Sequence, residues 1–260
     1  MKIYTKETLI KELKKIRDLG FISNARHGNH GGIGNTLEDL LGIEENNLPI
    51  PNADEWELKT QRLGTTSLTT LFHVEPSPQA LKFIPAVLLP KYGWRHQKAG
   101  LGYPEVEMSF RQTIHGLAPS DRGFKVVINE TEQKVLISFD SSVVAVKHLD
   151  WLKSVETRVG LGELNPQPYW GFADLAAKAG TKLHNCFYVQ AKVKREGGQE
   201  FYHYQKILKL TRFSFDNFLQ GLREGFVLVD FDARSGHNHG TKFRLRQNRL
   251  PDLYEHAEEI

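Results

Sequence analysis

The stretch Trp56-Glu57-Leu58-Lys59-Thr60-Gln61 decides the fold of this chain more than any other. Apolar and polar residues alternate along it, which predicts a β-strand whose successive side chains point to opposite faces. Glu57 and Lys59 are two positions apart and therefore share a face. A carboxylate beside an ammonium group offers a ligand for a divalent cation and a donor for water or a phosphate oxygen, and the main-chain carbonyl of Leu58 adds another oxygen.

A Glu-x-Lys pattern by itself is typical of any charged strand on a protein surface. Its neighbours favour a functional site instead. Asp54 lies three residues before Glu57, just past a proline turn, and Glu38 lies on a short predicted helix beside a glycine-rich loop. Thr60 and Gln61 continue the strand with polar side chains, where a core strand would carry apolar ones.

The composition excludes several classes of protein. With 40% hydrophobic and 25% charged residues, the chain has the make-up of an ordinary soluble globular protein. No apolar run approaches the roughly 20 residues of a bilayer-spanning helix, and the N-terminal residues lack the apolar region of a secretory signal. Cys186 is the one cysteine, which excludes an internal disulfide and a multi-cysteine zinc site. We expect a cytoplasmic protein with no membrane partner.

Charge is distributed unevenly along the chain, although the formal net charge is only +3. Five Lys or Arg, two histidines and no carboxylate occur between Arg234 and Arg249. Seven carboxylates and no basic residue occur between Glu38 and Glu57. An enzyme that cleaves phosphodiesters needs both regions, because cations hold the polyanion and carboxylates hold a hard metal against it.

Hydrophobic periodicity gives the order of the elements. Helices are predicted over 5–19 with Thr5 as N-cap, from Asn35 or Thr36 to Gly42, over 147–158 and over 215–222. Strands are predicted over 105–113, 186–193, 202–210 and 226–232, with a hairpin over 124–139 and a returning strand over 241–246. The predicted fold class is α/β, with a mixed sheet flanked by helices and a second lobe from the middle of the chain.

Three separated segments resemble one known family. They are Thr36-Leu37-Glu38-Asp39-Leu40-Leu41-Gly42, a Pro-Asx turn followed by Trp56–Gln61, and the run Asp232–Leu245. Their order and spacing resemble the MvaI/BcnI group of restriction endonucleases, which is related to MutH among the nucleases with a Pro-Asp…(Asp/Glu)-x-Lys site. The segments together span nearly the whole chain.

The resemblance implies a monomeric type II restriction endonuclease that grips double-stranded DNA between two lobes. The catalytic lobe would comprise residues 1–72 and 170–260, and the DNA-recognition lobe residues 73–169. The implied reaction is Mg²⁺-dependent hydrolysis of both strands, leaving 5′-phosphates. The implied target is a five-base-pair site of the form CC-N-GG with a restricted central pair.

The resemblance also implies that Glu38, Glu57 and Lys59 are catalytic, and we add Asp54 to them as the upstream carboxylate. Asp54, Glu57 and the Leu58 carbonyl would bind Mg²⁺, Lys59 would assist the nucleophile, and Glu38 would orient water or metal. The family aspartate lies five residues before the Glu of Glu-x-Lys, and this position is Asn52 here. An amide is a poor substitute for a magnesium carboxylate. Either Asp54 replaces it, which we favour, or the chain is catalytically impaired.

Two loops are predicted to contact DNA. In the C-terminal hairpin, the side chains expected to meet base edges or phosphates are Arg234, His237, His239, Lys242, Arg244 and Arg246. In the glycine-rich loop 26–34, the expected contacts are Arg26 and His30. The alternatives are a hairpin that touches only phosphates and a loop that merely connects. The glycine-rich loop lacks the Gly-Lys-Ser/Thr ending of a P-loop, so no nucleotide cofactor is expected.

Two other functions stay open at this point. A MutH-like repair nuclease would nick one strand and would need an activating partner protein. A catalytically impaired, sequence-specific DNA-binding protein is the second, and Asn52 is the residue that favours it.

Overall fold

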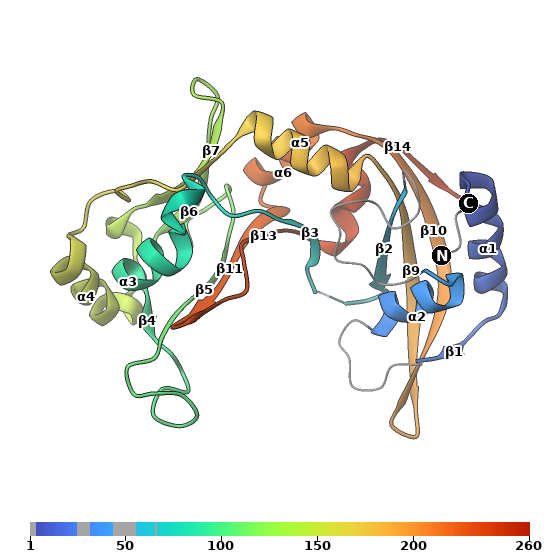
Figure 1. The fold of residues 1–260 in the computed structure, drawn as a ribbon, viewed down its shortest axis with the longest axis horizontal. Helices are drawn as coiled ribbons and strands as arrows, with labels where there is room; N and C mark the ends of the chain where they lie inside the picture. Colours follow the sequence, from blue (N-terminus) through green and yellow to red (C-terminus); the bar gives the residue numbers. More distant parts are fainter. Residues whose placement is uncertain (1–3, 25–31, 44–55, 66) are drawn as a thin grey trace. The chain divides into compact units, whose positions relative to one another are not determined.

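The computed structural model of the protein describes residues 4–24, 32–43, 56–65 and 67–260 (Figure 1). Asn52 and Asp54 lie outside these residues, as do Arg26 and His30. The chain divides into two compact units. Unit 1 contains the described residues through Thr69 together with Ala179–Phe215 and Arg246–Ile260, and unit 2 contains Thr70–Lys178 and Asp216–Leu245. Within the described ranges, no helix combines the length and the apolar character that crossing a bilayer requires.

Unit 1 is built on a mixed sheet, as predicted. Its strands are β1 (Ile22–Ser23), β2 (Trp56–Arg62), β9 (Asn185–Glu196), β10 (Gln199–Phe213) and β14 (Tyr254–Glu259). The order is β1-β10-β9-β2, and β14 also pairs with β10. The β2 strand runs parallel to β9, whereas the other pairs are antiparallel. The strand predicted over 56–61 is therefore confirmed, whereas β14 was not predicted.

Two helices cover one face of this sheet. They are α1 (Lys6–Asp18), which the Thr5 side chain caps as predicted, and α2 (Gly32–Leu41). Their apolar sides share one buried core with alternate residues of the strands; the members nearest β2 are Ile33, Leu37, Leu41, Trp56, Leu58, Phe187 and Val189. Because strand side chains alternate, Glu57 and Lys59 are left on the opposite face from Trp56 and Leu58.

The α2 helix begins earlier than the sequence predicted. It starts at Gly32 instead of Asn35 or Thr36, and it ends where predicted, before Gly42, whose φ of +68° is the left-handed conformation of a helix C-terminus. A Cβ at Gly32 would lie 2.8 Å from both Asn24 Nδ2 and Tyr202 Oη, so any larger residue there would force these side chains to shift. This close approach seats the helix on β10.

Unit 2 contains two further sheets. The larger has the order β3-β13-β11-β5-β4, with β12 paired to β11, and the smaller has the order β6-β7-β8. The strands of the larger sheet are β3 (Thr69–His73), β4 (Trp94–Arg95), β5 (Met108–Ile114), β11 (Val227–Arg234), β12 (His237–Asn238) and β13 (Lys242–Leu245). The smaller sheet consists of β6 (Phe124–Asn129), β7 (Lys134–Phe139) and β8 (Tyr169–Gly171). The hairpin predicted over 124–139 is confirmed by the pairing of β6 with β7.

The longer helices of unit 2 match the predictions in part. They are α4 (Leu149–Val159), α6 (Phe215–Arg223) and α5 (Phe172–Leu183). Helices α4 and α6 correspond to the predictions over 147–158 and 215–222. Helix α5 was not predicted, and its residues continue into unit 1. A short α3 (Leu89–Tyr92) precedes β4.

The division of the chain differs from the predicted lobes, because residues 170–178 and 216–245 lie in unit 2 and not with the predicted catalytic lobe. Residues 216–245 were assigned to the catalytic lobe because they follow its strands in sequence, but they belong to unit 2. The reason is the pairing of β11, which forms a ladder of six residue pairs with β5 and a ladder of four with β13. The C-terminal hairpin is therefore part of the second unit's sheet.

The packing of α2 yields the first prediction. Leu37 is 1% exposed and Leu40 is 40% exposed on the same helix. Leu37→Ala should lower the free energy of unfolding by about 2–5 kcal/mol, because it leaves a cavity in the core. Leu40→Ala should change it by about 0.5 kcal/mol or less. Urea denaturation of both variants measures the difference, and equal losses would contradict the observed orientation of α2.

Candidate active site

Glu57 and Lys59 form the centre of the candidate site in unit 1. Lys59 Nζ lies 2.8 Å from Glu57 Oε1, so the expectation that both side chains share a face is confirmed. Their side chains are 7% and 17% exposed, respectively. An ion pair this buried is expensive to desolvate, and removal of one partner leaves an uncompensated charge.

The second carboxylate oxygen of Glu57 is the feature that points to a ligand. Glu57 Oε2 is buried and has no hydrogen-bond partner among the residues that the structure describes. A buried carboxylate oxygen without a partner is costly, so a cation is the natural complement. Magnesium takes one or two carboxylates together with waters and phosphate oxygens, and this oxygen fits such an ion. No group of three or more His, Cys, Asp or Glu able to hold a metal occurs within the described ranges.

The neighbouring strand supplies neutral side chains to the same face. In the parallel ladder Glu57 is opposite Cys186 and Lys59 is opposite Tyr188. Burial raises the pKa of the Cys186 thiol to about 12, and it raises the pKa of Tyr188 to about 12. The Tyr188 hydroxyl donates a hydrogen bond to Gln61 Oε1. Both β9 side chains are therefore uncharged near neutral pH, so in these two residue pairs the charge belongs to Glu57 and Lys59.

Glu38 lies half-buried on α2, and this helix packs against β2. The approach is close, since a Cβ at Gly34 of α2 would lie 3.2 Å from Thr60 Oγ1. The structure therefore places Glu38 on an element next to the Glu57 strand. Its role toward water or metal stays a prediction.

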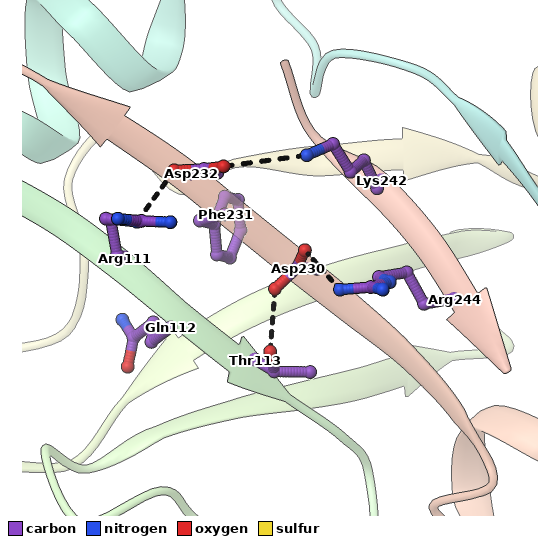
Figure 2. A pocket seen from close by; sticks show the side chains of 8 residues that line it. All are labelled: Arg111, Gln112, Thr113, Asp230, Phe231, Asp232, Lys242 and Arg244. Atoms are coloured by element: carbon purple, nitrogen blue, oxygen red, sulfur yellow. Dashed lines mark hydrogen bonds and ion pairs between the residues drawn. The ribbon is translucent and has the colours of Figure 1, made fainter. Parts of the chain in front are cut away.

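The strands β5, β11 and β13 carry a second set of polar side chains, in unit 2. These side chains line a cavity of about 280 Å³, and they include Arg111, Thr113, Asp230, Asp232, Lys242 and Arg244 (Figure 2). Asp232 lies 2.7 Å from Arg111 Nε and 3.6 Å from Lys242 Nζ. Asp230 lies 3.2 Å from Arg244 Nη1 and accepts a hydrogen bond of 2.6 Å from Thr113. The two aspartates thus hold the three cations in fixed positions.

Arg234 continues this polar face by one further step along β11. Its Nη1 lies 3.0 Å from Oε1 of the buried Glu107, and its guanidinium carbon lies 4.7 Å from the centre of the Tyr103 ring. Of the predicted DNA contacts, the structure brings Arg234, Lys242 and Arg244 onto one sheet. Arg246 follows β13 directly and belongs to unit 1.

The exposed turn and loop after β11 carry both histidines: His237 begins the short strand β12, which turns back onto β11, and His239 follows it. Their rings meet edge to face with 4.2 Å between centroids. Glu75 holds this loop, because it accepts hydrogen bonds from Thr241 N and Thr241 Oγ1, each of 3.0 Å, and from Asn238 Nδ2 at 3.3 Å. The loop is therefore fixed at its base while the two imidazoles face solvent.

Sequence reasoning missed several residues of these two surfaces. They are Cys186, Tyr188, Glu75, Glu107, Arg111, Asp230 and Asp232. Alternation along the predicted strand 226–232 could have placed the two aspartates on the face of Arg234. No sequence signal pairs β2 with β9 or Glu75 with the histidine loop, because these contacts join residues more than a hundred positions apart.

A mixed sheet with a buried Glu-x-Lys pair, in a chain whose second unit presents a charged strand face, fits the class of restriction nucleases. The model of the MvaI/BcnI restriction endonuclease family matches residues 10–254. The chain belongs to this family, as its resemblance predicted, and it is a site-specific deoxyribonuclease.

Solved structures agree with the fold. The chain is similar to a complex of restriction endonuclease MvaI with its cognate DNA substrate, at 24% identity and a TM-score of 0.76, over 98% of this chain and 99% of that chain. It is also similar to MvaI in the absence of DNA, at 24% identity and a TM-score of 0.54, over 97% and 98% of the two chains. No curated protein matches the sequence.

The environment of Cys186 yields the second prediction. The thiol is fully buried and its pKa is raised to about 12, so the reactive thiolate is absent near pH 8. The native protein should not react with Ellman's reagent at pH 8, whereas the unfolded chain should release one equivalent. Rapid stoichiometric reaction of the native protein would show that this face of the sheet opens.

Proposed function

We propose that this protein is a Mg²⁺-dependent type II restriction endonuclease that acts as a monomer and cleaves both strands of DNA. The proposed target is a five-base-pair site of the CC-N-GG type with a restricted central pair. The observation that carries the proposal is the buried Glu57 carboxylate, which has one oxygen fixed by Lys59 and the other without a partner among the described residues, in a chain of the MvaI/BcnI family.

The proposed roles follow from the chemistry of these groups. Mg²⁺, when bound, would polarise the scissile phosphate. Glu57 Oε2, a carboxylate oxygen of Asp54 and the Leu58 carbonyl would hold it. Lys59 donates hydrogen bonds to the attacking water and to a phosphate oxygen, and its bond to Glu57 Oε1 keeps the ammonium group at the strand surface. Glu38 would orient water from α2.

The unit 2 sheet fits the recognition of a site rich in G·C pairs. Guanine offers two acceptors in the major groove, which suit arginine, and cytosine offers an amino group, which suits a carboxylate. Arg111, Arg244, Asp230 and Asp232 provide both kinds of group on adjacent strands. The ion pairs fix their directions before DNA binds, which lowers the conformational entropy lost on binding.

Cleavage of plasmid DNA tests the proposal and its third prediction. With Mg²⁺, the wild type should yield defined linear fragments. Lys59→Ala should reduce cleavage at least a hundredfold while specific binding stays near the wild-type level, because Lys59 serves the chemistry. Lys192→Ala, an exposed lysine on β9, is the matched control and should cleave normally.

The other outcomes of this assay decide between the functions. Nicked circles from the wild type would favour the MutH-like strand-nicking enzyme. Uncut plasmid together with specific binding would favour the catalytically impaired DNA-binding protein that Asn52 suggests. Equal loss of binding and cleavage in Lys59→Ala would show that the Glu-x-Lys pair is structural.

The fourth prediction concerns the upstream metal ligand. Asp54→Ala should abolish cleavage to the same extent as Glu57→Ala, whereas Asn52→Ala should retain most activity, because a carboxylate binds Mg²⁺ far better than an amide. With Ca²⁺ bound, an Asp54 carboxylate oxygen should lie about 2.3 Å from the ion in a crystal structure. The opposite ranking, with Asn52→Asp raising activity, would assign the position to residue 52.

The fifth prediction separates base contacts from phosphate contacts in the C-terminal hairpin. His237→Ala or His239→Ala should cost about 1–3 kcal/mol of specific affinity and relax discrimination at one base pair. Arg246→Ala should weaken binding to all sequences alike and lower the salt slope by about one. Competition binding against duplexes with single changes measures both, and an unchanged specificity ratio in every variant would remove the hairpin from recognition.

A further inference from the structure

Unit 2 holds a second pocket, away from the charged face of β11 and β13. It measures about 610 Å³ and is formed around β4, the chain before β6, and α4. Its residues include Trp94, Arg122, Lys147, His148, Trp151 and Arg158. The volume lies within the range of about 300–1,000 Å³ that is usual for binding pockets.

Arg122 is the central residue of this pocket. Its guanidinium carbon lies 4.0 Å from the centre of the Trp94 ring and 5.0 Å from that of Trp151. Stacking on two indoles fixes the plane of the guanidinium. Within the described part of the chain, Arg122 Nη1 is buried and has no hydrogen-bond partner. A guanidinium that is held in place and has a free N–H can donate a hydrogen bond to an anion.

The charges around Arg122 favour an anion as well. Four Arg or Lys and one histidine line the pocket, against the single carboxylate of Asp150. Arg158 is held by the carbonyl oxygens of Pro90, Gly93 and Ser154, which neutralise no charge. Burial, followed by the charges of Arg122 and Lys147, lowers the pKa of His148. Lys147 is paired with Asp121 and Arg95 with Glu105, so the positive charge at the pocket that no carboxylate offsets among the described residues is that of Arg122 and Arg158.

The pocket lies two strands away from β11, which carries Arg234. Within the sheet Trp94 pairs with Ser109 of β5, and Ser109 pairs on its other side with Arg234 of β11. Two strand spacings amount to roughly 10 Å, which is about three base-pair steps along one DNA strand. A duplex that ran across the strands from β11 toward β4 would bring a backbone phosphate to this pocket.

We propose that the pocket around Arg122, Lys147, Trp94 and Trp151 binds a DNA backbone phosphate beyond the recognition sequence, with the adjoining sugar against the indoles. The inference rests on the proposed function for the identity of the duplex. The ligand chemistry is that of a phosphate ester, so a free nucleotide is the other source that the experiment must separate from DNA.

The experiment measures binding in Ca²⁺, across a salt series, to two cognate duplexes. One is trimmed to the recognition sequence and its immediate flanks, and the other is ten base pairs longer on each side. Arg122→Gln and Lys147→Gln should each lower the salt slope by about one on the long duplex and leave it unchanged on the short one. The control is Lys82→Gln, an exposed lysine of unit 2 that does not line the pocket, and it should behave as wild type.

Replacement of single flanking phosphates by neutral methylphosphonates locates the contact. One position should weaken the wild type about tenfold and leave Arg122→Gln unaffected. Lys147 is 64% exposed, so Lys147→Gln should keep the native fold even if Arg122→Gln unfolds the protein. Thermal melting of both variants checks this.

Three results would overturn the inference. In the first, both variants keep the wild-type slope on the long duplex. In the second, no methylphosphonate position distinguishes them from the wild type. In the third, deoxyadenosine monophosphate saturates the pocket by tryptophan fluorescence while the DNA slopes stay equal. If the wild type did not prefer cognate DNA, the proposed function would be overturned instead. The salt slopes of the variants and the wild type on the long duplex would still test the pocket.

Discussion

The parallel pairing of β2 with β9 is the constraint on which the candidate active site depends. It places Glu57 opposite Cys186 and Lys59 opposite Tyr188, two side chains that burial keeps neutral. The alternate residues of β2, Trp56 and Leu58, are fixed in the core under α2. A slip of one residue would bury the charged pair in that core and expose the tryptophan, so the register is strongly determined. The hydrophobic core thus orients the chemistry on the opposite face.

In unit 2, ion pairs hold the cationic side chains of the sheet in defined directions. Arg111, Lys242 and Arg244 are held by two aspartates (Figure 2). Arg234 is held by the buried Glu107. Surface ion pairs contribute little to stability, so their value here lies in direction. A side chain whose rotamer is already fixed loses less entropy when it meets a base or a phosphate. The same logic applies to Glu75, which fixes the base of the histidine loop.

Local signals were sufficient for most elements of the fold. Thr5 caps α1, the left-handed Gly42 ends α2, and alternation marks β2, because each of these features depends on residues a few positions apart. The division into units could not be predicted from local sequence signals. Residues 216–245 follow unit 1 in sequence but join unit 2, because β11 pairs with β5, more than a hundred residues earlier. Strand pairing over such distances leaves no periodic trace.

The sequence by itself determined the family, the mixed α/β class, and the shared face of Glu57 and Lys59, since motif spacing and side-chain alternation are properties of the chain. Only the tertiary structure decided what surrounds them. Burial leaves Glu57 Oε2 without a partner among the described residues, the parallel ladder brings neutral β9 side chains to the same face, and the β5–β11–β13 sheet pairs each cation with a carboxylate. The physical reason is that burial and charge pairing depend on which segments fold together, and that choice is made by long-range packing.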